Sequence, residues 1–196
     1  MPVAISGSGT ISGVSVGGLP DGIVDTDMLA ASAVTKPKSA GRVDGITEFD
    51  MWRITSGASL AGDTTISANW ERVDTDFEKI GTGLTESSGI FTFPSTGKWL
   101  IGAFAYIWTS SGPNYSGLGI YLSTNSGSSY EKRTEHLTSI NGAELAGSVF
   151  STACFDITNS STARIKLVAI TDITVQYNGH TNQNRTGLLA MKLGDT

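Results

Sequence analysis

Cysteine and charged residues are scarce in this sequence of 196 residues, and each shortage narrows the function. It has 1 cysteine, Cys154, so no disulfide can form within the chain. The apolar run around it, residues 149–157, predicts a buried and inert thiol. Only 16% of the residues are charged, and the net charge of −5 comes from scattered acids without a block of Lys or Arg. The chain therefore lacks the basic footprint expected for a nucleic-acid or anionic-membrane partner.

Long hydrophobic stretches are also missing. No window reaches the ~18 consecutive apolar residues of a membrane-spanning helix. The first residues, MPVAISGSGTISG, have neither the cationic region nor the long apolar region of a secretory signal. We therefore expect a protein that is neither secreted nor inserted in a membrane.

Residues suited to catalysis are few. The 2 histidines are His136, in the charged stretch EKRTEH, and His180, in the polar stretch NGHTNQNR. Neither belongs to a nucleophile–base pattern, and no HExxH, CxxC or Walker-type motif occurs. Nothing in the sequence places Glu78 and Glu86 as a glycosidase pair. The sequence predicts a protein that is not an enzyme, with no catalytic residue, metal or cofactor.

The stretch from Gly89 to Trp108 is the most informative part of the chain. It predicts a strand, a tight Pro94-Ser95-Thr96-Gly97 turn and a second, long strand. Side chains alternate along a strand, so the long strand has two faces that are both apolar. One face has Trp99, Ile101, Ala103, Ala105 and Ile107, and the other has Leu100, Gly102, Phe104, Tyr106 and Trp108. We expect the core to cover one face and further protein to cover the other.

Strand-like runs separated by turn signals continue through the rest of the chain. No helical pattern of 10–15 residues interrupts them, which argues against a βαβ architecture. The sequence therefore predicts an all-β sandwich or jelly roll for residues 50–196. The expected strands are Met51–Thr55, Trp70–Asp74, Phe77–Ile80, Gly89–Phe93, Trp99–Trp108, Gly117–Thr124, Tyr130–Leu137, Ser148–Ile157, Arg164–Ile170, Thr174–Tyr177 and Thr186–Leu193.

Residues 1–49 have a different character. They contain no Trp or Tyr, and their aliphatic residues are separated by Gly, Ser and Pro. Such a segment buries too little apolar area against itself to offset its conformational entropy. We expect an extended N-terminal arm that orders on a neighbouring molecule, with one short helix at Asp25–Val34. Its anchoring candidates are Ile11, Val14, Val16, Leu19, Ile23, Met28 and Leu29.

The body resembles the superfamily of tumour necrosis factor (TNF) and the complement C-one-q globular heads. The spacing of Leu84, Phe91, Gly97, Trp99 and Ile101 is similar to that family's signature, and Thr186-Gly187-Leu188-Leu189 is similar to its last strand. Three positions depart from the pattern: Ala103 and Arg185 stand where aromatics are usual, and Lys79 where Asn or Asp is usual. The resemblance implies a ten-stranded jelly roll and a homotrimer whose protomers pack apolar sheet faces together. The expected trimer-facing residues are Phe104, Tyr106, Trp108 and Leu188; the alternative is that all four lie in the core of the monomer.

The arm has a resemblance of its own. The phrase GTISGVSVGGLPDGIVDTDMLAASAVT is similar to segments of tail-fibre and other virion proteins of bacteriophages. Together the two resemblances imply a trimeric decoration (cement) protein on the capsid surface, made in the host cytoplasm. Its partners would be further copies of itself and the major capsid protein.

Two other functions stay open. The first is the receptor-binding tip of a tail or head fibre, with a host surface glycan as partner. In that case the sugar-stacking candidates are Trp52, Trp70, Tyr115 and Tyr130. The second is a cellular glycan-binding or signalling head, which the absence of a secretion signal and of a collagen-like stalk disfavours.

Overall fold

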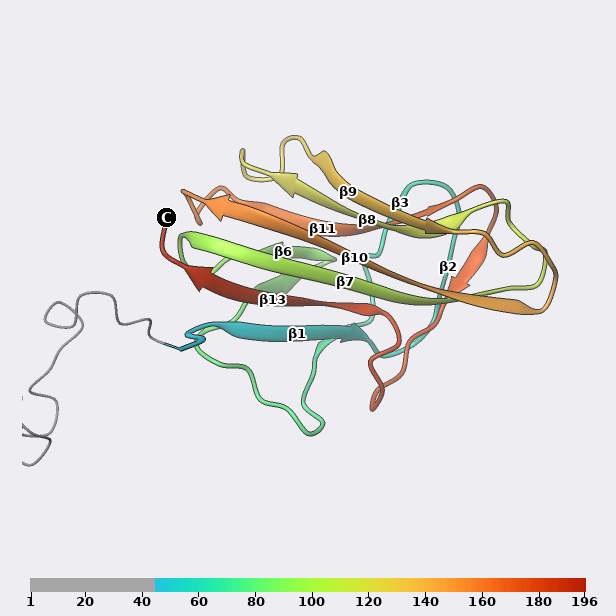
Figure 1. The fold of residues 1–196 in the computed structure, drawn as a ribbon, viewed down its shortest axis with the longest axis horizontal. Coiled ribbons are helices and arrows are strands. Elements are labelled where there is room, and N and C mark those ends of the chain that lie inside the picture. Colours follow the sequence, from blue (N-terminus) through green and yellow to red (C-terminus); the bar gives the residue numbers. More distant parts are fainter. Residues whose placement is uncertain (1–44) are drawn as a thin grey trace, which may run out of the picture. The chain divides into compact units, whose positions relative to one another are not determined.

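Within residues 45–196, the part of the chain that the computed structural model describes, every regular element is a β-strand. The strands form two antiparallel sheets, drawn as two layers in Figure 1. Sheet A contains β1 (Phe49–Ile54), β2 (Ala58–Leu60), β4 (Trp70–Arg72), β7 (Gly97–Thr109), β10 (Leu145–Ile157), β12 (Val175–Tyr177) and β13 (Gly187–Gly194). Sheet B contains β3 (Thr64–Thr65), β5 (Thr85–Ser87), β6 (Ile90–Thr92), β8 (Ser116–Ser123), β9 (Glu131–Thr138) and β11 (Arg164–Thr171).

The long strand β7 organises sheet A. On one side β10 pairs with it along its whole length, from Gly97↔Ile157 to Thr109↔Leu145. On the other side β13 and then β12 pair with successive parts of β7, and β1 and β4 continue the sheet beyond β13. In sheet B, β11 lies between β6 and β8, and β9 forms the edge. The all-β sandwich predicted from the sequence is confirmed.

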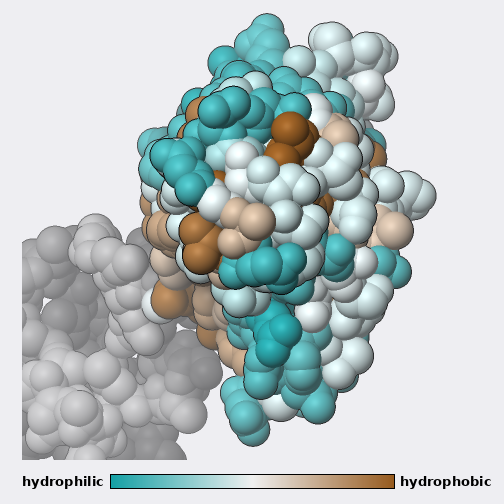
Figure 2. Space-filling model, turned by 90° about the vertical axis from the view of Figure 1, so that its right-hand side faces the viewer, coloured by the Kyte–Doolittle hydropathy of each residue, from teal (hydrophilic) through white to brown (hydrophobic). Residues whose placement is uncertain are grey.

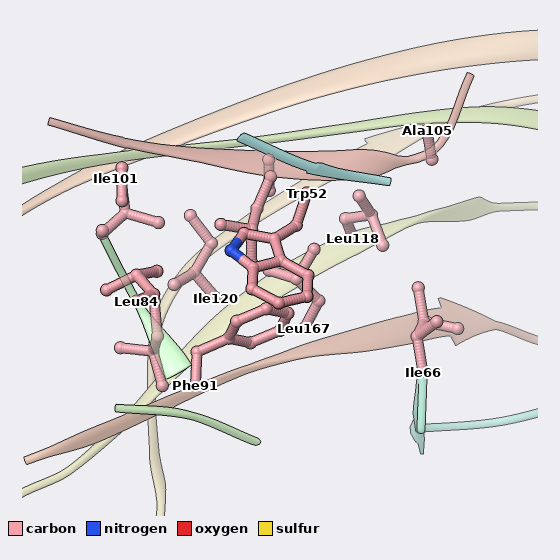
Figure 3. Close-up of a cluster of buried hydrophobic side chains, with 14 of the residues drawn as sticks. Trp52, Ile66, Leu84, Phe91, Ile101, Ala105, Leu118, Ile120 and Leu167 are labelled. Carbon is pink, nitrogen blue, oxygen red and sulfur yellow. The ribbon is translucent and has the colours of Figure 1, made fainter. Parts of the chain in front are cut away.

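The core lies between the two sheets and is built around aromatic rings. Figure 3 shows Trp52 and Phe91 at its centre, surrounded by aliphatic side chains from both sheets. The two rings meet edge to face, with centroids 5.6 Å apart, and Trp70 approaches Phe91 in the same way at 4.9 Å. Such pairs add about 0.5–1.5 kcal/mol to the area that they bury.

A buried polar cluster joins β1 to the segment that follows β4. The Asp50 carboxylate is fully buried and accepts hydrogen bonds from Trp52 Nε1 at 2.9 Å and from the Leu84 backbone N–H at 2.8 Å. Arg72 donates to the same carboxylate through Nε at 3.0 Å, and its guanidinium lies 4.5 Å from the centroid of the Trp52 ring. Because a buried charge needs a partner, this cluster depends on each of its members.

The expected strands agree with the structure except in a few places. Residues 77–80 form no strand: Ile80 makes an isolated bridge to Phe49, and Phe77 packs edge to face on the Phe49 ring. Positive φ angles at Asp76 (58°) and Gly81 (76°) turn the backbone at both ends of this segment. The short strands β2, β3 and β5 carry too few residues for a periodic pattern and were not predicted. The helix expected at Asp25–Val34 lies outside the described residues.

Candidate assembly surface

The two faces of β7 have different surroundings, as the alternation of its side chains predicted. Trp99, Ile101, Ala103, Ala105 and Ile107 are all buried in the core. On the other face Leu100, Phe104 and Trp108 are half-buried, and Tyr106 keeps 37% of its surface exposed. An apolar row therefore lies on the side of sheet A that faces away from sheet B.

Neighbouring strands extend this row across the sheet. Residues that are paired in register share a face, so the outer face of each strand follows from its partner on β7. Beside Leu100 lie Met191 of β13 and Phe49 of β1 on one side, and Cys154 of β10 on the other. We call the following residues the assembly surface: Phe49, Met51, Leu100, Phe104, Tyr106, Trp108, Phe150, Cys154, Leu189 and Met191.

Two glycines let aromatic rings lie close to the sheet. A Cβ atom at Gly187 would stand 2.9 Å from Cζ of Phe104, and one at Gly102 would stand 3.2 Å from Cζ of Phe150. The two rings thus cover backbone that has no side chain of its own. Phe150 still exposes 53% of its surface, which is unusual for a phenylalanine in a strand.

An open hollow lies beside these rings. Its volume is about 750 Å³, and its walls include Phe104, Tyr106 and Phe150 from the sheet and Asn184 and Arg185 from the loop before β13. The hollow is therefore lined by aromatic rings together with the Asn184 amide and the Arg185 guanidinium. Aromatic residues and Arg are the residue types enriched at protein–protein interfaces.

The edge of sheet A at β10 has no strand partner beyond β7 among the described residues. His136 Nδ1 contacts the Phe150 carbonyl oxygen at 2.6 Å, so this carbonyl points away from β7. By the two-residue period of a strand, the other even-numbered residues of β10 also turn their N–H and C=O groups outward. Side chains of β9 meet part of this edge, since Thr134 Oγ1 also lies 3.1 Å from Ser151 Oγ, but no strand pairs with it. An edge without a strand partner invites pairing or covering by another chain.

The structure places three of the four residues expected at a trimer interface on the assembly surface: Phe104, Tyr106 and Trp108. Their role between copies stays a prediction. The expectation for Leu188 is wrong, because its side chain is 0% exposed and belongs to the core; Leu189 has the outer position. The anchoring candidates Ile11, Val14, Val16, Leu19, Ile23, Met28 and Leu29 lie outside the described residues.

Sequence reasoning missed Phe150 and misplaced Cys154. Val149, Ser151, Phe155 and Ile157 are buried. In a strand, the residues between them must then point the other way. Cys154 is one of these and is exposed, so the prediction of a buried thiol is wrong. Alternation along the expected strand Ser148–Ile157 is the signal that places both side chains on the outer face.

The other residues considered for sugar binding, catalysis or metal binding do not come together in one site. Trp52 is buried and Trp70 packs against the core, so neither offers a ring to a sugar. His136 holds the edge of β10, and His180 Nδ1 accepts a hydrogen bond from the Asn182 backbone at 3.0 Å. Residues 45–196 contain no group of three His, Cys, Asp or Glu that could hold a metal ion, and no helix that could span a membrane.

Hydrophobic side chains do not gather at the end of the sandwich. Figure 2 shows the end that lies on the right in Figure 1, and its surface is mainly hydrophilic, with hydrophobic residues in small separate groups. Scattered apolar residues are normal on a soluble surface. The assembly surface differs, because its apolar residues are neighbours across four adjacent strands.

No family model and no curated protein matches the chain. Solved structures do match. Murine APRIL at pH 8.5 superposes with a TM-score of 0.55 and 15% identity, over 74% of this chain and 98% of that chain. Eiger TNF from S. frugiperda superposes with a TM-score of 0.59 and 14% identity, over 76% of this chain and 95% of that chain.

These likenesses show the fold. The described body is a TNF-like jelly roll, as the resemblance in the sequence implied. The loose sequence pattern predicted this fold because its residues build the core: Leu84, Phe91, Trp99 and Ile101 are all buried there.

Proposed function

We propose that the protein is a bacteriophage virion protein: a trimeric decoration (cement) protein that binds the outside of the capsid through its N-terminal arm. The observation that carries this proposal is the assembly surface, an apolar outer face on a sheet whose other face already covers the core. Burial of exposed apolar area stabilises by about 25 cal/mol per Å², so the face favours contact with other copies. The hydrophilic end in Figure 2 offers no comparable surface.

A closed ring of copies suits the fold. Each copy would cover the assembly surface of the next, and a stable interface needs about 800 Å² from each partner. Closure by rotation leaves no face open for further growth, so the product is a discrete particle component and not a filament. The unpaired edge of β10 would be covered in the same contact.

The arm supplies attachment. Its aliphatic residues, from Ile11 to Leu29, would fill shallow grooves between subunits of the major capsid protein. Three arms on one rigid trimer bind multivalently, so weak contacts of single arms add up to a stable complex. The sequence resemblance to phage virion segments supports this role, with synthesis in the host cytoplasm and final location on the capsid surface.

Deletion of residues 1–41 tests the attachment. The truncated protein should remain a folded trimer that no longer co-sediments with shells lacking the decoration protein. Retained binding by the truncated protein would refute the role of the arm.

Copy number on the intact particle tests the location. Imaging should show hundreds of copies distributed over the shell. A few copies at one vertex or on the tail would instead identify a fibre tip.

A further inference from the structure

A second surface feature lies on the outer face of sheet B, on the opposite side of the sandwich. Tyr121 of β8 pairs in register with Lys166 of β11. Both alternate with core residues, since Ile120 and Leu167 are fully buried, so both side chains point away from the core. With Tyr130, from the loop before β9, they form what we call the tyrosine–lysine platform.

The ammonium group of Lys166 lies between two aromatic rings. Nζ is 4.4 Å from the ring centroid of Tyr130 and 5.7 Å from that of Tyr121. Both distances are within the roughly 6 Å at which a cation is attracted to a ring. Within residues 45–196, no carboxylate lies within salt-bridge distance of Lys166, whereas Lys132 and Arg133 on β9 of the same sheet both form ion pairs.

Those other cations have partners. Lys132, opposite Tyr121, pairs with Glu135. The Arg164 guanidinium donates to the backbone carbonyl oxygens of Ala163 at 2.7 Å and Ser161 at 2.9 Å. Within residues 45–196, Lys166 is therefore a cation that two rings hold in place and that pairs with no carboxylate, whereas the Arg164 guanidinium is bound by backbone oxygens.

The backbone shapes the platform around Tyr121. A Cβ atom at Gly119 would stand 2.8 Å from Cε2 of Tyr121, so the ring lies along the sheet where a larger residue would lift it. A β-bulge at the same position gives β9 an extra residue and brings Lys132 opposite the ring. Partial burial raises the pKa of both Tyr121 and Tyr130, and the nearby Asp63 and Glu135 carboxylates raise that of Tyr121 further. Like any tyrosine, both are protonated at neutral pH and can donate hydrogen bonds.

We propose that the tyrosine–lysine platform binds an acidic carbohydrate. The C–H face of a sugar ring packs on a tyrosine, the two phenols bind its hydroxyl groups, and Lys166 pairs with its carboxylate or sulfate. The platform lies on the sheet opposite to the assembly surface, so self-association leaves it accessible. This inference does not depend on the function proposed above.

Binding of small saccharides to the 196-residue chain tests the inference. The probes are 3′-sialyllactose, a hyaluronan tetrasaccharide and a heparin tetrasaccharide, which present a sialic acid, a uronic acid and sulfate groups; lactose is the neutral match for the first. Two-dimensional NMR should show shifts at the amides of Tyr121, Tyr130 and Lys166 with at least one acidic probe. Lactose should give shifts at least tenfold weaker at equal concentration.

Single substitutions distinguish binding at the platform from attraction by the charge of the protein in general. Lys166→Met keeps the aliphatic stem and should weaken binding about tenfold or more, and Tyr130→Leu should do the same through lost stacking. Lys98→Met removes an equal charge from sheet A and should leave binding unchanged. The inference is wrong if no acidic probe binds at millimolar concentration, if the shifts map elsewhere, or if Lys98→Met and Lys166→Met weaken binding equally. Shift mapping on the unaltered protein decides the question even where a variant does not fold.

Discussion

Replacement of Phe150 by Ala should disrupt self-association, because this ring is the most exposed aromatic group of the assembly surface. A phenylalanine buries about 200 Å² when it is fully covered, and 53% of that area is open in the single chain. Covering it by a neighbour removes about 100 Å² from water, which contributes about 2.5 kcal/mol at about 25 cal/mol per Å². A trimer contains three such contacts, so the total is about 7.5 kcal/mol.

This energy converts to a measurable shift in concentration. Since every 1.4 kcal/mol is a factor of ten, the trimer association constant falls by roughly five orders of magnitude, and the midpoint concentration rises by roughly 500-fold. Sedimentation velocity over a dilution series measures that midpoint. Leu137→Ala is the matched control, because Leu137 is an exposed (45%) apolar residue of sheet B away from the assembly surface. An equal midpoint for Phe150→Ala and the unaltered protein would refute the assignment of this surface.

Three further predictions concern the fold. Asp50→Asn leaves the Arg72 guanidinium, whose side chain is 34% exposed, beside a neutral amide. It should cost about 2 kcal/mol, a fall of roughly 6 °C in melting temperature, and a fall below about 2 °C would contradict the role of the cluster. Gly187→Ala places a Cβ atom 2.0 Å from a backbone oxygen of β1 and should abolish soluble expression, whereas Gly194→Ala, with nothing within 4 Å, should be neutral. Burial raises the pKa of Tyr177, whose hydroxyl donates a hydrogen bond to a backbone carbonyl at 2.6 Å. The protonated phenol therefore stabilises the folded state fully below about pH 10, the pKa of tyrosine in the unfolded chain, and this stabilisation is lost as the pH rises further. At pH 7, the free energy of unfolding of Tyr177→Phe, measured by urea titration, should therefore be about 1–2 kcal/mol lower than that of the unaltered protein. This difference in free energy should become smaller at pH 11, and an equal difference at both pH values would contradict the burial argument.

The sequence predicted the parts of the fold in which side-chain periodicity is strong. The two faces of β7 were assigned correctly, because 13 residues in one strand leave no doubt about alternation. Strands of two or three residues, such as β3 and β5, have no period and depend on the partners that the fold brings beside them. The segment from Phe77 to Ile80 has the composition of a strand, but its backbone turns at both ends.

The assembly surface was predictable in part. Phe104, Tyr106 and Trp108 were identified from one strand, whereas Phe150 and Leu189 join them only through pairing between strands distant in sequence. Leu188 and Leu189 illustrate the difficulty: two adjacent leucines face opposite sides, and the register with β7 decides which one is buried. The Asp50 cluster was missed for the same reason, since Arg72 and Leu84 reach it from 22 and 34 residues away.

The mass of the 196-residue chain in solution is the most direct test of self-association through this surface. Light scattering coupled to gel filtration, at micromolar concentration, should give about 62 kDa, which corresponds to three chains of 20.5 kDa. A stable species of 20.5 kDa under the same conditions would show that the apolar face of sheet A needs no partner, and would contradict the account.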